Sequence, residues 1–101
     1  MNCLKQPTFR SEAWRRAVAS LPCVCCMKDG PSQAAHANHR GKGMAHKASD
    51  VFVAPLCPTC HAEFDQGKRW SKQEKRELMD EWILQTIDRL ARDGMIKALL
   101  T

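Results

Sequence analysis

The chain has 101 residues, with sixteen Lys and Arg against eleven Asp and Glu, a net charge of +5 and a pI near 9.1. This length suits a single domain over residues 1–101, and no window approaches the roughly 18 apolar residues of a membrane span. The first residues also lack an apolar run of signal-peptide length, so we expect a cytoplasmic protein. The basic surplus favours an anionic partner.

A short helix is predicted near the N-terminus. Ser11 is a suitable N-cap, and Pro22 ends the run. The apolar residues between them recur at helical spacing: Ala13, Trp14, Ala17, Val18 and Leu21. This spacing predicts a packing helix whose other face, with two arginines, lies in solvent.

Two C-x-x-C pairs follow, Cys23 with Cys26 and Cys57 with Cys60. This spacing allows four thiolates to reach one tetrahedral Zn²⁺, and in a reducing compartment paired cysteines are more often metal ligands than disulfides. Cys25 could replace Cys26 as a ligand, although C-x-x-C geometry favours Cys26. A site closed by four cysteines is structural, so any chemistry must come from residues beside it.

Two strands are predicted between the cysteine pairs, over Gln33–Ala37 and Asp50–Leu56. We expect them to pair as an antiparallel hairpin. The connecting loop contains two glycines and the cations Arg40, Lys42 and Lys47, with no acid in that stretch. These glycines allow close approach to a nucleic-acid backbone, and we expect the cations to bind DNA by contacting its phosphates without reading its bases.

A further helix is expected after Cys60, through about Gln66, with Gly67 as its C′ residue. His61 and Asp65 would then lie at positions i and i+4 on one face of that helix. Two ligands stacked in this way can hold a second metal ion.

The last helix begins at Ser71, which forms a capping box with Glu74, and it extends to Gly94. Its apolar stripe has a 3.6-residue period and predicts core packing: Met79, Trp82, Ile83, Thr86, Ile87, Leu90 and Ala91. The basic residues around its start favour a solvated face: Lys68, Arg69, Lys72, Lys75 and Arg76. The tail Met95–Thr101 could form a strand or a turn.

The order of these parts resembles that of the HNH, or ββα-metal, nucleases that carry a paired-cysteine zinc knuckle. The runs H-A-N, G-K-G-M, K-A-S-D and P-L-C-P-T-C-H-A-E-F-D further resemble small phage and prophage proteins of the YbcO type, which are assigned as nucleases. The likeness spans roughly Leu21 to Lys68. It implies a small α+β fold, a ββα-metal core with a four-cysteine zinc knuckle, flanked by an N-terminal helix and a long C-terminal helix.

The resemblance also implies roles for individual residues. His36 matches the general base, and Asp50 occupies the place of the usual central Asn, from which it could hold the imidazole. His61 matches the last histidine of the motif, a ligand of the catalytic metal, and Asp65 matches a further ligand found in some members. The implied activity is a metal-dependent DNA endonuclease with structural Zn²⁺ and catalytic Mg²⁺ or Mn²⁺, serving phage or prophage DNA processing or recombination.

One departure from the pattern keeps other functions open. Many members carry a metal ligand immediately before the general base, and here that residue is Ala35, whose side chain we expect to point at the ion. The chain could therefore be a zinc-ribbon-like DNA-binding module that has lost catalysis, or a structural zinc domain that binds a protein through its long helix. Within the loop, His39 and His46 could contact phosphate, replace a ligand, or have no role.

Overall fold

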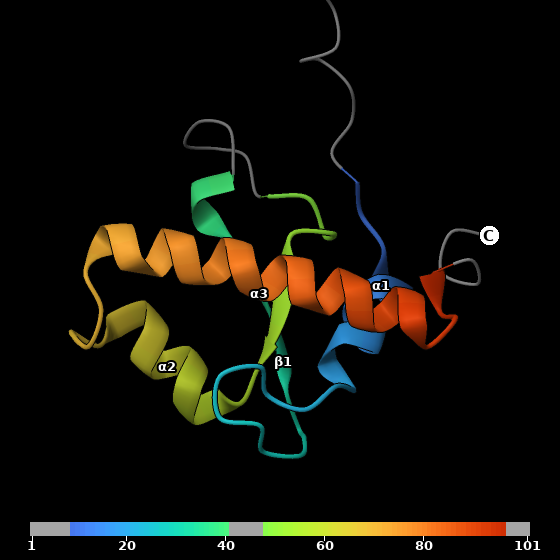
Figure 1. Cartoon of the computed structure of the whole chain (residues 1–101), viewed down its shortest axis with the longest axis horizontal. Coiled ribbons are helices and arrows are strands. Elements are labelled where there is room, and N and C mark those ends of the chain that lie inside the picture. The colour runs from blue at the N-terminus through green and yellow to red at the C-terminus, as the bar shows by residue number, and fades with distance from the viewer. Residues whose placement is uncertain (1–8, 41–47, 97–101) are drawn as a thin grey trace, which may run out of the picture.

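The structure, a computed structural model, describes residues 9–40 and 48–96. Its elements in chain order (Figure 1) are α1 (Glu12–Ala19), β1 (Gln33–His36), the 3-10 helix η2 (Asn38–Arg40), β2 (Val53–Leu56), α2 (Pro58–Gln66) and α3 (Lys72–Arg92). They form the small α+β fold that the sequence predicts. None of the helices in the described part of the chain is both long enough and apolar enough to cross a membrane.

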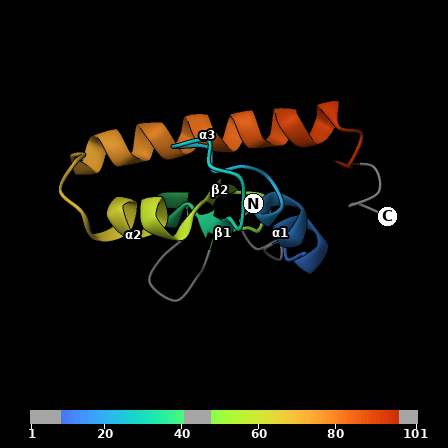
Figure 2. The same ribbon diagram turned by 90° about the horizontal axis from the view of Figure 1, so that it is seen from below.

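The elements lie in two layers. Figure 2 shows α3 as one layer, extending across the other, in which the hairpin lies between α1 and α2. The long C-terminal helix α3 contacts both β2 and α1, so it packs along the hairpin and the N-terminal helix. This arrangement leaves α2 against the hairpin, where its side chains reach residues of β1.

The hairpin is antiparallel, with Gln33 opposite Leu56 and His36 opposite Val53. The expected pairing is confirmed, but the prediction that the second strand begins at Asp50 is wrong. Residues 50–52 form a turn, in which the Phe52 N–H bonds to the Ser49 carbonyl at 2.9 Å. Asp50 therefore precedes the strand, and its buried side chain faces the N-terminal segment instead of joining the ladder.

Two apolar clusters cover the two faces of β2. Ala54 and Leu56 contact the larger cluster between α2 and α3, which also contains Phe64 and Trp82. Val53 belongs to the smaller cluster, made with residues of α1, the segment just after it and the end of α3: Trp14, Ala17, Val18, Leu21 and Leu90. Because every residue of β2 is buried, this strand forms the centre of the fold.

The helix ends follow local rules with two exceptions. Ser71 and Glu74 form the predicted capping box, and Gly94 ends α3 with φ of 72°. However, α2 begins at Pro58 instead of after Cys60, because Cys57 serves as the N-cap. Gly67 has φ of −76°, so it is not the left-handed residue expected, and a Cβ there would clash with the Glu63 carbonyl.

Candidate metal centre and histidine groove

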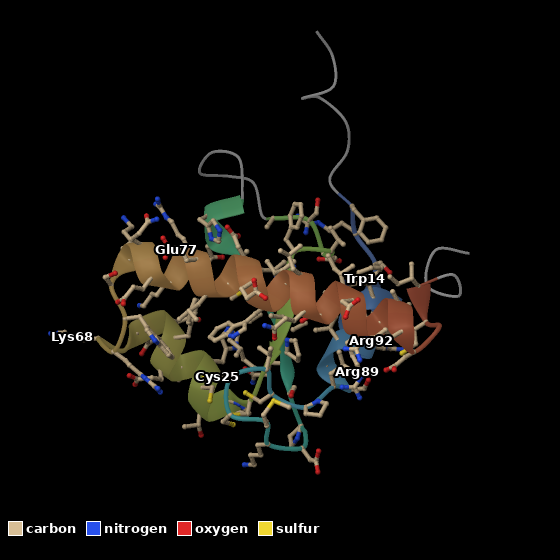
Figure 3. All side chains as sticks on the ribbon, viewed as in Figure 1. Trp14, Cys25, Lys68, Glu77, Arg89 and Arg92 are labelled. Atoms are coloured by element: carbon tan, nitrogen blue, oxygen red, sulfur yellow. The ribbon has the colours of Figure 1, made fainter. Side chains whose placement is uncertain are left out.

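The four cysteines of the two C-x-x-C pairs meet at one place. The sulfur atoms of Cys23, Cys26, Cys57 and Cys60 all lie within 4.8 Å of one another. Figure 3 shows sulfur atoms gathered where the loop before β1 meets the start of α2. Sulfur ligands about 2.3 Å from a tetrahedral Zn²⁺ are about 3.8 Å apart, and Cys26 and Cys57 are separated by that distance, 3.8 Å. The four cysteines are thus positioned to bind a metal ion, and the set is consistent with structural zinc.

Backbone hydrogen bonds shape the loop that carries the first cysteine pair. The Met27 N–H bonds to the Cys23 carbonyl at 2.8 Å, and Met27 has φ of 66°, which tightens the turn. The Val24 N–H bonds to the Pro55 carbonyl at 2.8 Å, which ties the loop to β2. Because Cys57 follows β2 directly, this bond brings the two cysteine pairs together.

The pKa shifts of the cysteines and the repulsion between neighbouring thiolates also favour a bound cation. Burial raises the pKa of Cys23, but N–H groups of Cys57, Cys26 and Cys25 outweigh burial and lower it to about 7. Burial and the neighbouring sulfur atoms raise the pKa of Cys60. A cation among the four sulfur atoms would remove the repulsion between neighbouring thiolates. Cys25 is not in the cluster and packs against the larger core, so the choice of Cys26 is supported.

A second group of polar contacts converges on Asp50. Its carboxylate, with 3% of the side chain exposed, accepts hydrogen bonds from the Ser11 N–H at 2.7 Å and from Arg10 at 3.2 Å, and pairs with Arg15 at 3.1 Å. Burial by itself would raise the pKa of Asp50, but His36, the Ser11 N–H and the two arginines outweigh it and lower the pKa. Asp50 is therefore an ionised anchor between α1 and the hairpin.

His36 is held by this anchor. Its Nε2 lies 2.8 Å from Oδ1 of Asp50, so the expected contact between these residues is present. An ionised carboxylate can only accept a hydrogen bond, and Nε2 must therefore donate. This fixes the tautomer of a neutral His36 and leaves Nδ1 with the lone pair that a general base needs. The base role itself stays a prediction.

His61 and Asp65 lie together on α2, as the i, i+4 spacing predicts. Nε2 of His61 is 3.3 Å from Oδ2 of Asp65, and Nδ1 is 2.6 Å from Oε1 of Gln33 on β1. Both side chains are partly exposed. The cysteine cluster is the one group of three or more potential metal ligands among the described residues, so no third residue of this kind joins His61 and Asp65 there.

A groove of about 390 Å³ runs between the end of β1, α2 and the start of α3. Two histidines and one acid line it, His36, His39 and Asp65. Three cations lie along the same groove: Lys72, Lys75 and Arg76. The basic residues near the start of α3 were expected to form a solvated face, but these three border the groove because α3 crosses over α2. Lys68, in contrast, extends away at the turn between α2 and α3 (Figure 3).

Two other expectations have different outcomes. Lys42 and Lys47, with the side chain of Arg40, lie outside the described residues, so the role of the loop stays a prediction. Ala35 was expected to point at a catalytic ion, and this is wrong: it is 2% exposed and packs in the core with Phe64. Alternation along β1 turns Ala35 to the opposite face from His36.

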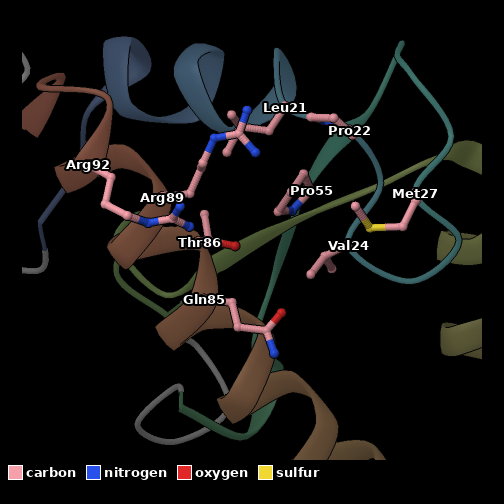
Figure 4. Close-up of a pocket in the computed structure, with 9 residues that line it drawn as sticks. All are labelled: Leu21, Pro22, Val24, Met27, Pro55, Gln85, Thr86, Arg89 and Arg92. Atoms are coloured by element: carbon pink, nitrogen blue, oxygen red, sulfur yellow. The ribbon is translucent and has the colours of Figure 1, made fainter.

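A smaller cavity of about 190 Å³ is lined by residues of the cysteine loop, of β2 and of α3 (Figure 4). Val24, Met27 and Pro55 form its apolar part, and the α3 residues Arg89 and Arg92 border it. Its lining contains no histidine, cysteine or acid. It therefore has no group suited to hydrolysis, and the histidine groove is the better candidate site.

Sequence reasoning assigned no role at the site to four residues of this region: Arg10, Arg15, Gln33 and Asp80. Each contacts a candidate site residue more than twenty positions away in the sequence. No local pattern marks such contacts, because they depend on how α1 and α3 pack.

The fold and site define a small α+β domain in which four cysteines are positioned to bind a metal ion and two histidines, His36 and His39, line a basic groove. The chain belongs to the family described as "Protein of unknown function (DUF968)", whose profile matches residues 1–91. It is 30% identical over 96 residues to "Uncharacterized protein YdfU" of Escherichia coli (strain K12), a match that covers 95% of this chain and 27% of that protein. The chain thus spans about a quarter of this relative's length. No solved structure matches.

Proposed function

We propose that this chain is a metal-dependent DNA endonuclease that hydrolyses phosphodiester bonds. The observation that carries this proposal is the groove itself, in which His36 and Asp65 converge with three cations of α3. Hydrolysis of a phosphodiester needs a base for the attacking water and positive charge near the phosphate. The groove offers both kinds of group within one cavity.

His36 takes the proton of the attacking water in this proposal. Asp50 holds Nε2 of the ring, so Nδ1 is the nitrogen that receives the proton. Asp50 also accepts hydrogen bonds from Arg10 and the Ser11 N–H, which keep the carboxylate, and with it the ring, in a single orientation. A base whose carboxylate partner is itself fixed in this way needs little reorganisation during the reaction.

His61 and Asp65 are the residues that would hold a catalytic Mg²⁺ or Mn²⁺. Two protein ligands on one helix face suit an ion that keeps several water molecules and binds substrate oxygens. When bound, this ion would stabilise negative charge on the phosphate and the departing 3′ oxygen. The Gln33 contact with Nδ1 of His61 leaves Nε2, the nitrogen beside Asp65, as the metal-binding atom.

The three cations of α3 are suited to bind the phosphate backbone on either side of the scissile bond. Such contacts position nucleic acid without reading its sequence. The choice of DNA as substrate, and a role in phage or prophage DNA processing or recombination, rest on the resemblance to HNH nucleases.

The test is a plasmid-nicking assay with Mg²⁺, with Mn²⁺ and with chelator. We expect divalent-ion-dependent nicking that His36→Ala abolishes while metal binding stays nearly intact, because His36 contacts Asp50 and not the His61–Asp65 pair. Gln85→Ala, on the far side of α3 beside the smaller cavity, is the matched control and should cleave normally. Absence of ion-dependent cleavage by the intact protein would refute the proposal.

A second candidate is a DNA-binding module without catalysis. The specific observation in its favour is Ala35, which is buried in the core and leaves the catalytic ion with two protein ligands instead of three. A salt-dependent gel shift without any cleavage would support this candidate. Neither cleavage nor a gel shift would favour a domain that binds a protein partner.

A further inference from the structure

The proposed function does not use a second histidine–aspartate pair, whose histidine lines the groove. His39 lies on η2, and its Nε2 is 2.8 Å from Oδ1 of Asp80 on α3. The His39 side chain is 19% exposed, so the ring is largely held by the protein yet still lines the groove. His36 lines the same groove, and two imidazoles thus border one cavity.

The two pairs have the same geometry. In each, Nε2 faces a carboxylate at 2.8 Å from another part of the fold. An ionised carboxylate accepts from Nε2 whether the ring is neutral or protonated, so Nδ1 is the atom at which a proton is received or given. The pairs differ in their surroundings, because Asp50 also accepts from Arg10 and the Ser11 N–H and pairs with Arg15.

Phosphodiester hydrolysis needs a proton donor as well as a base. The departing 3′ oxygen is an alkoxide, which is a poor leaving group until a proton or a metal ion neutralises its charge. A second histidine that lines the same groove as the base is suited to supply that proton. His39 on η2, held by Asp80 of α3, lines the groove together with His36 at the end of β1.

We propose that His39, positioned by Asp80, is the general acid of this site. The inference rests on the proposed function. As the bond between the water oxygen and phosphorus forms, the water's proton passes to Nδ1 of His36. As the bond from phosphorus to the 3′ oxygen breaks, Nδ1 of His39 gives its proton to that oxygen. The products are a 5′-phosphate and a 3′-hydroxyl, and proton exchange with solvent restores both rings.

Other charged groups face His39 in the groove and take part in any pH dependence. They come from β1, α2 and α3: His36, Asp65, Lys72, Lys75, Arg76 and Asp80. The three cations disfavour a further positive charge, whereas the two carboxylates favour it. A pH profile alone would therefore not identify the donor, and the test must depend on the leaving group.

The experiment compares two substrates in the full chain loaded with zinc and Mn²⁺. Plasmid DNA has an alkoxide leaving group that requires a proton, whereas bis(p-nitrophenyl) phosphate releases p-nitrophenolate, which does not. His39→Ala should slow DNA cleavage by roughly 100-fold or more, the usual contribution of a general acid. The rate of hydrolysis of the p-nitrophenyl ester should change by less than about 3-fold, because its leaving group needs no proton from an acid. His36→Ala is the control and should slow both reactions, because both need a base.

His39→Gln separates an acid from a positioning residue, because glutamine can still donate a hydrogen bond to Asp80 but has no transferable proton. Glutamine should leave DNA cleavage as slow as alanine does. Equal slowing of both substrates by His39→Ala, or recovery of DNA cleavage in His39→Gln, would overturn the proposal and leave the nuclease function intact. If the unmodified protein cleaved neither substrate, the proposed function would fail and this inference with it.

Discussion

Asp50 is the buried charge on which α1, the hairpin and the candidate base all depend. Asp50→Asn keeps the size of the side chain but removes its charge and one acceptor oxygen. In the folded chain both carboxylate oxygens are used, Oδ1 by His36 and Arg10 and Oδ2 by Ser11 and Arg15. The NH2 group that replaces one of these oxygens in asparagine cannot accept any of these bonds, whereas the remaining carbonyl oxygen still can.

The expected cost can be estimated from the exposure of the partners. Hydrogen bonds to a buried charge contribute about 1.5 to 3 kcal/mol each, and one of those from Ser11 and His36 is lost outright. Arg10 and Arg15 have side chains 46% exposed and can turn to water, so each adds well under about 1 kcal/mol. We expect Asp50→Asn to lower the free energy of unfolding by about 2 to 3 kcal/mol in total, which for a domain of this size lowers the Tm by about 10 to 20 °C.

Thermal and urea unfolding of the zinc-loaded proteins measure this cost. Asp88→Asn is the matched control, because Asp88 forms an exposed i, i+4 pair with Arg92 and should cost under about 0.5 kcal/mol. The pKa of Asp50 is lowered in the folded state, so its contribution is complete above the unfolded pKa of about 3.9 and is lost as pH falls through the folded pKa. The difference in free energy of unfolding between Asp50→Asn and Asp88→Asn should therefore stay constant from about pH 5 to 8 and become smaller below about pH 4. Equal stability of the two variants at pH 7 would refute the ion-pair anchor.

Other variants test the zinc site, the groove and the core. Cys57→Ala should lose its metal and most of its stability, whereas Cys25→Ala should keep one tightly held zinc per chain. Metal analysis measures the zinc content. A zinc-loaded Cys57→Ala protein would contradict the shared site. Lys72→Ala should weaken binding to all DNA sequences alike, and the slope of log binding constant against log salt concentration should become shallower by about one. Lys68→Ala, outside the groove, should change neither the affinity nor the slope. Equal effects of the two substitutions on DNA binding would argue against the groove as the binding site. Ala35→Asp should destabilise the fold by several kcal/mol, about the cost of burying a carboxylate without a partner, instead of improving metal affinity. Urea unfolding decides the last point, because unchanged stability would mean that the side chain reaches solvent.

Much of the fold was predictable because its signals are local. The caps at Ser11 and Ser71 depend on hydrogen bonds between residues three apart, and the stripe of α3 depends on helical periodicity. The hairpin follows from two short apolar segments around a polar loop. The starts of α2 and β2 were less predictable. Cys57 caps α2 through its sulfur atom, and the backbone turns at Asp50, where the carboxylate accepts from the Ser11 N–H and the N–H donates to the Phe9 carbonyl.

The cysteine site shows how far spacing alone can reach. Two C-x-x-C pairs and a return of the chain between them are enough to predict one shared ion, because this spacing allows four thiolates to reach a single tetrahedral metal ion. Spacing also places His61 and Asp65 on one helix face.

The sequence by itself determined the elements, their order, the shared cysteine site and the His61–Asp65 pair, because each follows from residues close together or from a motif with strict geometry. Only the tertiary structure decided which face of β1 is buried, and hence that Ala35 lies in the core. The crossing of α3 over α2 likewise decided that Lys72 and its neighbours border the groove. These features depend on the packing of helices against both faces of a central strand, and packing of this kind has no local signature along the chain.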